Sequence, residues 1–209
     1  IKDNNPNSTN KEVLQETKNN NPNFNEIIIP NSKSINNSLV DLYYLDNFLN
    51  HEECKEIIKL TRTHFKKSTI IDKEDYTTSN WRTSQTCYLN TISENKELIS
   101  NINNRICHLM NIKDVFSEEI QAQYYQEGQE FKAHTDFFDP GTNLNDINLR
   151  GNRTWTFMIY LNDVELGGET TFININKSFK PKEGMALIWN NNNLDGTLNY
   201  NTLHQGMSP

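Results

Sequence analysis

The second half of the chain is a succession of short strand-like segments separated by turns. From residue 119 onward, strand-sized segments are rich in β-branched and aromatic residues: EIQAQYYQ, EFKAH, RTWTFMIYLN, GETTFI, SFKP and MALIWN. Glycines punctuate the series, and the pair Gly167-Gly168 is best explained by a tight turn between two strands. Many short strands that close on one another predict a jelly roll, also called a double-stranded β-helix.

Two helices are expected ahead of this β region. Asn50 is a good N-cap residue and Glu53 follows three positions later, a variant of the capping box that predicts a helix over residues 51–65. An apolar stripe at helical spacing, which includes Ile102, predicts a second helix over residues 93–110. Strands are predicted before the first helix, in FNEIIIP and LVDLYYLDNFL, and between the helices, in WRTSQTCYL. The expected fold class is mainly β with buttressing helices (α+β), around a cupin-like jelly-roll core.

The chain of 209 residues is long enough for one domain with its own core. Residues 1–22 are polar and rich in asparagine, so we expect a tail or linker there, with a short helix within it. Residues 23–209 are expected to form a single domain, in which 23–117 supports a jelly-roll core at 118–209. Because the chain starts without a methionine and stops within what reads as a motif, we expect a piece of a longer product.

Charge and cysteine content exclude some classes of function. The net charge is -7, with acidic and basic residues interspersed, so the surface is poorly suited to a nucleic acid backbone. The three cysteines form no CxxC pair, and we expect free thiols in a reducing compartment such as the cytoplasm. No run approaches the roughly 18 apolar residues of a membrane span, so no membrane contact is expected in the visible chain.

A candidate metal site lies at the end of the run YYQEGQEFKAHTD. His134 and Asp136 are two residues apart on a predicted strand, and residues at that spacing share one face. A third ligand would have to come from far away in the sequence, and His204 is the candidate. Two histidines and one carboxylate are typical of non-haem Fe(II) oxygenases, although an isolated HxD is more often a surface pair. The other histidines have no partner at ligand spacing and are expected on helix surfaces: His51, His64 and His108.

Zinc is an alternative metal for the same ligand set. Zinc hydrolases with two histidines and a carboxylate usually place them in an HExxH motif on a helix, and this motif is absent from the sequence. The choice between iron and zinc therefore depends on the motifs around these residues.

Residues 40–209 resemble the prolyl 4-hydroxylase branch of the Fe(II)/2-oxoglutarate dioxygenases. The segments that carry the resemblance occur in the order found in that family: YLDNFLNHEEC, WRTSQTCYL, QYYQEGQEFKAHTDFF, NRTWTFMIYLNDVELGGETTF, FKPKEGMALIWN and DGTLNYNTLHQGMSP. Six motifs in order are far more specific than any one of them.

The resemblance implies a cofactor site in the predicted core. His134, Asp136 and His204 would bind Fe(II), leaving room for 2-oxoglutarate and O2, and metal binding should weaken in acid as the imidazoles are protonated. Tyr125 matches the tyrosine that hydrogen-bonds the far carboxylate of 2-oxoglutarate, although a core tyrosine is the simpler alternative. The family's basic anchor for that carboxylate would lie near position 214, beyond Pro209. The alternative cations within the chain are Lys180 and Lys182, whose context reads as a turn.

The resemblance also implies substrate contacts. Arg82 and Ser84 match a loop that closes over a peptide substrate, and Glu118 and Arg153 match positions at the mouth of the site. Solvent-facing polar residues without a binding role remain the alternative for all four. The polar segment at residues 137–152 has the length of a lid or substrate-selecting loop.

The function implied is that of a 2-oxoglutarate-dependent dioxygenase that hydroxylates a peptidyl residue, with proline 4-hydroxylation preferred. 2-Oxoglutarate and O2 would be converted to succinate and CO2, and ascorbate is a candidate reductant. The expected partner is a proline-containing peptide or protein. A hydroxylase of a free amino acid or other small molecule is the alternative, and a non-catalytic jelly-roll binding module is disfavoured by the complete set of three ligands.

Overall fold

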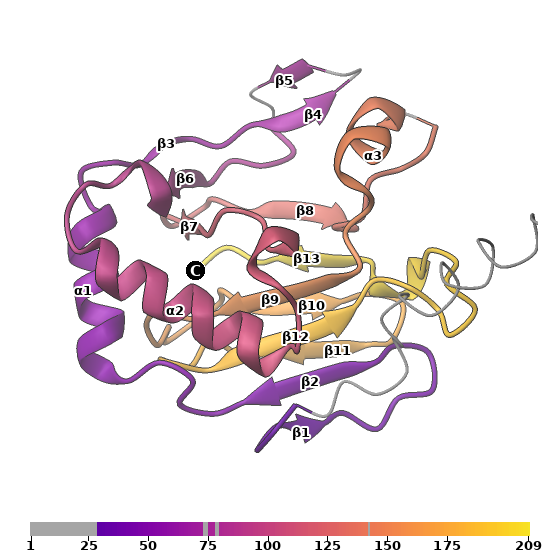
Figure 1. Ribbon diagram of the computed structural model, residues 1–209, viewed down its shortest axis with the longest axis horizontal. Coiled ribbons are helices and arrows are strands. Elements are labelled where there is room, and N and C mark those ends of the chain that lie inside the picture. Colours follow the sequence, from indigo (N-terminus) through magenta and orange to yellow (C-terminus); the bar gives the residue numbers. More distant parts are fainter. Residues whose placement is uncertain (1–28, 73–74, 78–79, 142) are drawn as a thin grey trace, which may run out of the picture.

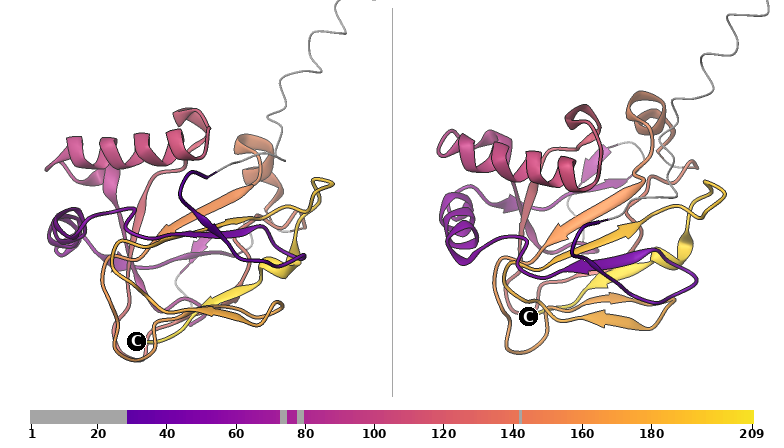
Figure 2. Two further views of the ribbon diagram at one scale, coloured as in Figure 1. Left: turned by 90° about the horizontal axis from the view of Figure 1, so that it is seen from below. Right: turned by 60° about the horizontal axis from the view of Figure 1, so that its bottom comes forward.

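A computed structural model describes residues 29–72, 75–77, 80–141 and 143–209 of the chain. Two four-stranded antiparallel sheets pack face to face at its centre (Figures 1 and 2). The predicted tail at residues 1–22, its short helix and most of the segment FNEIIIP lie outside the described residues.

The two sheets are built from strands that are distant in sequence. The first has the order β1-β2-β12-β9, and the second has the order β11-β10-β13-β8. The first sheet consists of β1 Lys33–Ser34, β2 Leu42–Leu45, β12 Ala186–Asn190 and β9 Trp155–Ile159. The second consists of β11 Lys177–Phe179, β10 Thr170–Phe172, β13 His204–Gly206 and β8 Phe131–His134. This is the predicted jelly roll, and its first sheet takes two strands from the region predicted to be a support.

The central strand β12 explains how the core is arranged. All five of its residues are buried, because both faces of the strand are covered. Leu187 and Trp189 pack between the two sheets with Phe172 of β10. Ala186 and Ile188 point the other way and pack against residues of the helices. The first sheet is therefore the middle layer of the domain.

The helices α1 and α2 cover the outer face of that layer (Figure 2). Helix α1, His51–Thr61, begins with the predicted capping box, because the Asn50 side chain accepts from the Glu53 N–H and the Glu53 carboxylate accepts from the Asn50 N–H. It ends four residues earlier than predicted, and β3 follows at Lys66–Lys67. Helix α2, Lys96–Leu109, buries Ile102.

A third sheet extends the second jelly-roll sheet beyond β8. It contains β3, β6 at Gln85–Tyr88 and β7 at Gln121–Tyr124. The segment before β6 bonds directly to β8, since the Thr83 N–H donates to the Glu130 carbonyl and the Lys132 N–H donates to the Trp81 carbonyl, both at 2.9 Å. A short hairpin follows β3, formed by β4 Ile70–Asp72 and β5 Asp75–Thr77.

Short helices occupy several connections. Within the described residues, three of them are 3-10 turns: η1 Leu89–Thr91, η2 Asp114–Phe116 and η3 Tyr200–Thr202. The segment at residues 137–152 was predicted as a loop with the length of a lid or substrate-selecting element, but it contains a helix, α3 Leu144–Arg150, which stands clear of the two sheets (Figure 1). The sequence gives little sign of α3, because Asn143 makes no side-chain cap and Leu149 is exposed.

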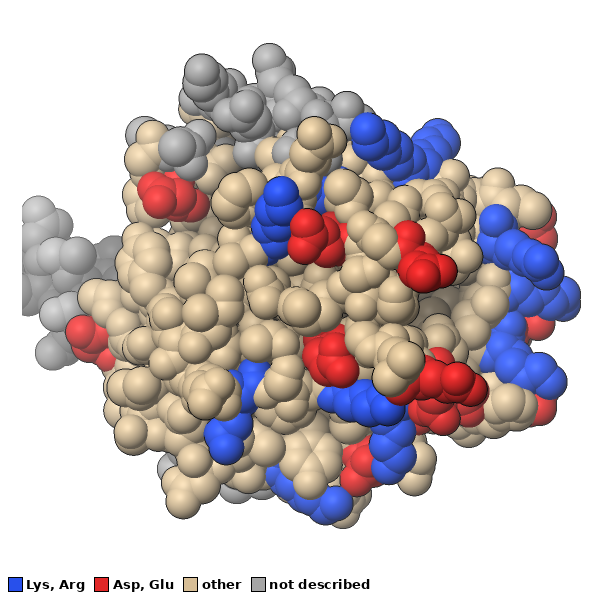
Figure 3. Space-filling model, turned by 180° about the vertical axis from the view of Figure 1, so that it is seen from behind, with Lys and Arg blue, Asp and Glu red and all other residues tan. Residues whose placement is uncertain are grey.

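The surface and the cysteines agree with the predictions from composition. Acidic and basic side chains are interspersed on the face shown in Figure 3. All three cysteines are free and buried, and burial raises the pKa of each thiol: Cys54, Cys87 and Cys107. None of the helices in the described ranges is long and apolar enough to cross a membrane.

One turn depends on a glycine for two reasons. Gly184 has φ +73°, and a Cβ at this position would overlap the Leu49 carbonyl oxygen at the start of α1. Gly196 has a similar φ, +84°, but no atom of the described chain lies within 4 Å of its Cβ position. We expect Gly196→Ala to cost about 1–2 kcal/mol of unfolding free energy and Gly184→Ala to cost more than about 3 kcal/mol, since overlap is added to strain. Urea denaturation of both variants measures the difference, and equal losses would contradict it.

Candidate active site

Strand pairing brings the two predicted histidine ligands together. His134 ends β8, His204 begins β13, and the two residues are direct partners in the antiparallel register. Asp136 follows β8 at the same edge. One donor atom from each of the three residues lies within 4.8 Å of the others, which makes them a candidate metal cluster among the described residues. The Asp136 Oδ1 atom is 3.6 Å from His134 Nε2 and 3.8 Å from His204 Nε2.

The backbone fixes the orientation of both imidazoles. His134 Nδ1 lies 2.8 Å from the Lys132 carbonyl oxygen, and His204 Nδ1 lies 2.9 Å from the Thr202 carbonyl oxygen. Because a carbonyl oxygen only accepts, each Nδ1 carries a proton and each Nε2 presents a lone pair toward Asp136. Burial lowers the pKa of His134 to about 4, so this ring is neutral at neutral pH. Neutral imidazoles and a carboxylate suit a divalent first-row metal ion, and Fe(II) fits this donor set.

Aromatic rings surround the two histidines. His134 stacks on Phe131 with ring centroids 3.5 Å apart and an interplanar angle of 14°. His204 contacts Phe172 at 5.4 Å and Trp189 at 5.0 Å between ring centroids. These contacts limit rotation of both rings and keep one side of the cluster dry, whereas the Asp136 side lies toward the loop at residues 137–152.

The first sheet holds Asp136 from the opposite side. Thr156, on β9, donates from Oγ1 to Asp136 Oδ2 at 2.5 Å, and Asn191 Nδ2 donates to Thr156 Oγ1 at 3.0 Å. Burial alone would raise the pKa of the Asp136 carboxyl, but the two imidazoles and the Thr156 hydroxyl hold it below its ordinary value. Since Oδ2 is occupied by Thr156, Oδ1 is the oxygen directed at the histidines.

Tyr125 lies beside the candidate metal cluster, directly after β7. Its hydroxyl oxygen is 3.5 Å from where a Cβ on Gly206 would lie, two residues beyond His204. Burial raises the pKa of Tyr125, so the phenol keeps its proton and can donate to an anion. Tyr124 is exposed and packs on Phe65 at 5.4 Å, as expected from the alternation of side chains.

Two of the four predicted substrate residues form one bidentate pair. Arg153 donates from Nε and Nη2 to the two Glu118 carboxylate oxygens, at 2.6 and 2.9 Å. It also donates from Nη1 to the Asp136 main-chain carbonyl at 3.2 Å, and its guanidinium lies 4.4 Å from the Phe138 ring centroid. The pair is partly exposed, so it forms a rim next to the cluster.

The other two predicted substrate residues lie deeper. The Arg82 guanidinium is 4.7 Å from the Phe131 ring centroid, and its Nη1 donates to the Thr69 carbonyl. Its buried Nε has no hydrogen-bond partner within the described part of the chain. The Ser84 side chain is fully buried and bonds to Ser68 at 2.9 Å. The predicted contact of Ser84 with a peptide does not fit this position, because a peptide cannot reach the hydroxyl.

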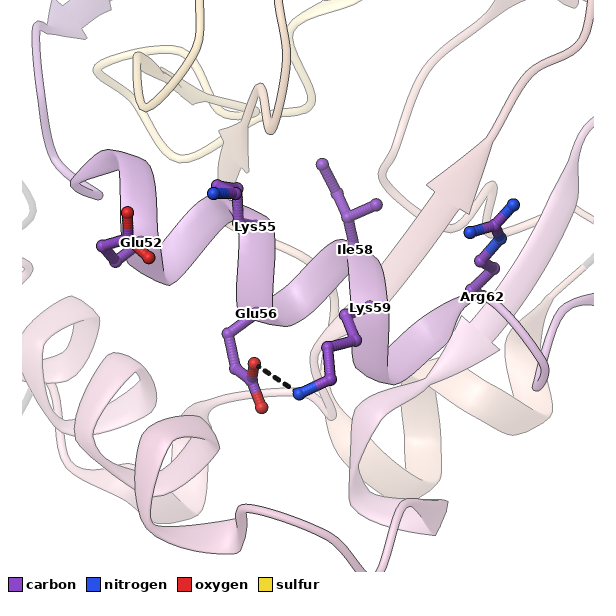
Figure 4. Close-up of a pocket in the computed structure, with 6 residues that line it drawn as sticks. All are labelled: Glu52, Lys55, Glu56, Ile58, Lys59 and Arg62. Atoms are coloured by element: carbon purple, nitrogen blue, oxygen red, sulfur yellow. Dashed lines mark hydrogen bonds and ion pairs between the residues drawn. The ribbon is translucent and has the colours of Figure 1, made fainter.

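The remaining candidates lie apart from the three-residue cluster. Lys180 donates to the Glu165 carbonyl, and Lys182 pairs with Asp46. His51 bonds to Glu183, and His64 bonds to the Leu60 carbonyl. A pocket along α1 is lined by charged side chains and one apolar side chain of the helix and its C-cap residue, with an ion pair between Glu56 and Lys59 (Figure 4): Glu52, Lys55, Glu56, Ile58, Lys59 and Arg62. This pocket contains none of the candidate ligands.

Sequence reasoning missed Thr156 and Asn191. Alternate residues of β9, among them Trp155 and Phe157, were expected in the core, and they pack against the helix-side cluster. The polar Thr156 between them must face the other sheet, and this alternation was the sequence signal that could have identified it. Its partner Asn191 follows β12 and could be found only from the pairing of β12 with β9.

Comparisons with known proteins agree with this geometry. Residues 120–209 match the model of the 2OG-Fe(II) oxygenase superfamily. The chain is 32% identical over 183 residues to "Probable prolyl 4-hydroxylase 3" of Arabidopsis thaliana, covering 77% of this chain and 61% of that protein. It is 30% identical over 165 residues to "Prolyl 4-hydroxylase subunit alpha-1" of Gallus gallus, covering 77% of this chain and 31% of that protein. The chain thus spans less than two thirds of these relatives.

Two solved structures share the fold. The viral collagen prolyl hydroxylase of Paramecium Bursaria Chlorella virus-1, in complex with 2OG, has a TM-score of 0.59 at 23% identity, covering 80% of this chain and 87% of that chain. A Pseudomonas putida prolyl-4-hydroxylase has a TM-score of 0.52 at 12% identity, covering 80% and 85%. The chain therefore carries a 2OG-Fe(II) oxygenase superfamily domain at residues 120–209. The resemblance to its prolyl 4-hydroxylase branch, seen first in the motifs, is confirmed by the relatives.

The Thr156 hydroxyl allows a test of how Asp136 is held. Thr156→Val removes the proton donor to Oδ2 at nearly constant volume, so the carboxylate is free to rotate. We expect metal affinity to fall by roughly 10–100-fold, as for other partners of metal ligands. Thr156→Ser keeps the hydroxyl and should keep most of the affinity. Titration of Co(II) into the metal-free protein, followed by d–d absorption, measures both variants, and equal losses would contradict the role of the hydroxyl.

Proposed function

We propose that residues 23–209 form the catalytic domain of an Fe(II)/2-oxoglutarate-dependent dioxygenase that hydroxylates peptidyl proline at C4. The observation that supports this most is the convergence of three donors from paired strands, with both imidazole protons held by the backbone. Such a cluster holds a metal on one side and leaves the other side for cosubstrate and substrate. The prolyl 4-hydroxylase names of the relatives given above support proline as the target residue.

The residues of this chain have distinct roles in the proposal. His134, Asp136 and His204 hold the iron, and Tyr125 hydrogen-bonds the far carboxylate of 2-oxoglutarate. The bound iron supplies the oxidative chemistry, in which 2-oxoglutarate and O2 yield succinate and CO2 while the substrate gains a hydroxyl group. The protein excludes water with the rings around the histidines, and ascorbate serves as the candidate reductant.

The substrate-binding rim is proposed from the remaining polar residues at the site. Arg153 bonds to both Glu118 and the main chain of Asp136, so it connects the rim to the metal cluster. Arg82 brings a second cation beside Phe131. A peptide backbone offers carbonyl oxygens to such cations, which suits a polypeptide substrate, whereas the net charge of -7 disfavours a nucleic acid. The buried free thiols are compatible with a reducing compartment such as the cytoplasm.

Succinate formation tests the activity directly. With Fe(II), O2 and 2-oxoglutarate, proline-rich peptides should stimulate succinate production by the full-length protein. His134→Ala and Asp136→Ala should abolish it, because each removes a metal ligand. His51→Ala, which changes an exposed histidine bonded to Glu183, should keep full activity. Removal of the metal by a chelator should stop turnover, and Fe(II) but not Zn(II) should restore it.

An iron-loaded protein that makes no succinate with any peptide would contradict the proposed function. Stimulation by free proline or another amino acid, with none by peptides, would favour the small-molecule alternative instead. Mass spectrometry of the product peptide, which locates the added oxygen, decides whether proline is the target.

The Glu118–Arg153 pair offers a test of the rim. Glu118→Gln weakens the bidentate grip on Arg153 without touching the metal ligands. We expect the KM for peptide to rise about two- to five-fold, since a partly exposed ion pair is worth roughly 0.2–1 kcal/mol. The KM for 2-oxoglutarate should not change. Glu56→Gln, in the exposed Glu56–Lys59 pair of α1, is the matched control. A larger effect on metal or 2-oxoglutarate binding than on peptide binding would refute the assignment.

A further inference from the structure

A network of buried hydrogen bonds joins Asp136 to His204. At its centre are two asparagines, Asn191 directly after β12 and Asn199 directly before η3, and the Asn199 N–H donates to the Asn191 carbonyl at 2.9 Å. Asn191 is fully buried and Asn199 is 2% exposed. The hydrogen bonds that these two residues make are therefore shielded from water.

One branch of the network ends on Asp136. Asn191 Nδ2 donates to Thr156 Oγ1 at 3.0 Å, and Thr156 donates to Asp136 Oδ2 at 2.5 Å. A carboxylate only accepts hydrogen bonds and a hydroxyl has one proton, so Thr156 must donate to Asp136 and accept from Asn191. The Asn191 amide can therefore face Thr156 only with its NH2 group. Its buried Oδ1 atom has no hydrogen-bond partner among the described residues.

The second branch ends on His204. The Asn199 carbonyl oxygen accepts from the Thr202 N–H at 3.1 Å and from Thr202 Oγ1 at 2.7 Å. The Thr202 carbonyl oxygen in turn accepts from His204 Nδ1 at 2.9 Å, and Thr202 is fully buried. Asn199 thus holds the residue whose carbonyl orients the His204 ring.

The side chain of Asn199 anchors the centre of the network. Its Nδ2 atom donates to the Leu39 carbonyl at 2.7 Å, and its Oδ1 atom accepts from the Asn201 N–H at 3.0 Å, which caps η3. Together with the main-chain contacts, every polar group of Asn199 is hydrogen-bonded, as expected for a buried residue. The residue therefore fixes η3 against the segment before β2.

We propose that Asn191 and Asn199 are positioning residues that hold Asp136 and His204 at the separation needed to share one metal ion. The Asp136 Oδ1 and His204 Nε2 atoms lie 3.8 Å apart, and the hydrogen-bond partners of the two ligands meet at the bond between the asparagines. His134 is held separately, by the main chain of β8. This inference rests on the proposed function, in which all three ligands bind iron.

Asn191→Leu tests the branch to Asp136. It removes the donor to Thr156 at nearly constant volume, and it also removes the buried oxygen that has no partner. We expect the Kd for Co(II) to rise about two- to ten-fold, the usual net effect of one hydrogen bond. The urea midpoint of the metal-free protein should change little, because an apolar group of similar shape replaces an unsatisfied polar one. A role in packing alone would instead lower the midpoint.

A double variant tests whether this branch passes through Thr156. Since Asn191 acts on Asp136 through the Thr156 hydroxyl, Asn191→Leu combined with Thr156→Val should bind Co(II) about as weakly as Thr156→Val alone. Residues that act on a ligand by independent routes give losses that add. Additive losses would therefore overturn the branch.

Asn199→Ala tests the connection between the branches. It removes the cap of η3 and the bond to Leu39, so both ligands lose support. We expect the Kd for Co(II) to rise about ten-fold or more, since a cap and a hydrogen bond are lost together. The loss should persist in the Thr156→Val background, because the branch to His204 does not pass through Thr156. A loss that vanishes in this background would overturn the branch to His204.

The measurement is titration of Co(II) into the metal-free full-length protein, followed by the d–d absorption bands, whose shape reports the coordination geometry. The bands of Asn199→Ala should change in shape, because the ligands themselves move. Asn193→Ala is the control, since Asn193 lies in the same connection and donates to the Leu198 carbonyl but is exposed. It should keep the wild-type Kd and spectrum. If Asn199→Ala does not fold, the Asn191→Leu and Thr156→Val cycle decides alone.

The results separate the two proposals. If the wild-type protein binds neither Co(II) nor Fe(II), the proposed function fails. If it binds Co(II), but Asn191→Leu and Asn199→Ala keep the wild-type Kd and spectrum, the positioning role alone is overturned. Losses of affinity that follow the losses of urea stability in all variants, with an unchanged spectrum, would also overturn it, since they would report a general loosening of the fold.

Discussion

The antiparallel pairing of β8 with β13 is the contact on which the site depends. It places His134 opposite His204, although the two residues are 70 positions apart in the chain. At direct partner positions in antiparallel strands, side chains on the same face are about 4.5–5.5 Å apart at Cβ, a spacing at which two imidazoles can share one ion. The main-chain carbonyl two residues before each histidine then accepts from Nδ1, so both rings present Nε2 to the cluster. The strand register and the backbone thus assemble most of the cluster before any metal binds.

The third ligand shows why the site needs two sheets. Asp136 lies just beyond the end of β8, where no ladder hydrogen bonds hold the chain, yet its carboxylate must keep one oxygen toward the histidines. Thr156 reaches it from the first sheet, and Asn191, next to β12, holds Thr156 in turn. Burial of β12 on both faces keeps β9 and β12 in register, which positions this pair. Packing by the helices on the outer face therefore supports the geometry of the carboxylate two layers away.

The sequence was sufficient to predict the features that depend on neighbouring residues and those carried by the family motifs. The capping box at Asn50 and Glu53 fixed the start of α1, because both partners are close in sequence. The three candidate ligands followed from the HxD spacing and the later motif. The burial of Ser84 was not foreseen, because it depends on the pairing of this segment with Ser68 after β3, and α3 was missed because it has no side-chain cap. Thr156 and Asn191 depend on sheet pairing, which no local pattern reveals.

The third sheet gives the site its asymmetry. Tyr125 directly follows β7 and Ser84 directly precedes β6, and the segment at Thr83 bonds to β8, so the third sheet continues the sheet that carries the two histidines. The interior behind Tyr125 is filled by hydroxyl groups, whereas the interior behind His204 is filled by Phe172 and Trp189. A ligand with a polar end and a metal-binding end would thus lie along one sheet, with its polar end toward β7. The Glu118–Arg153 pair adjoins Asp136 at the other end, where the side chains are partly exposed.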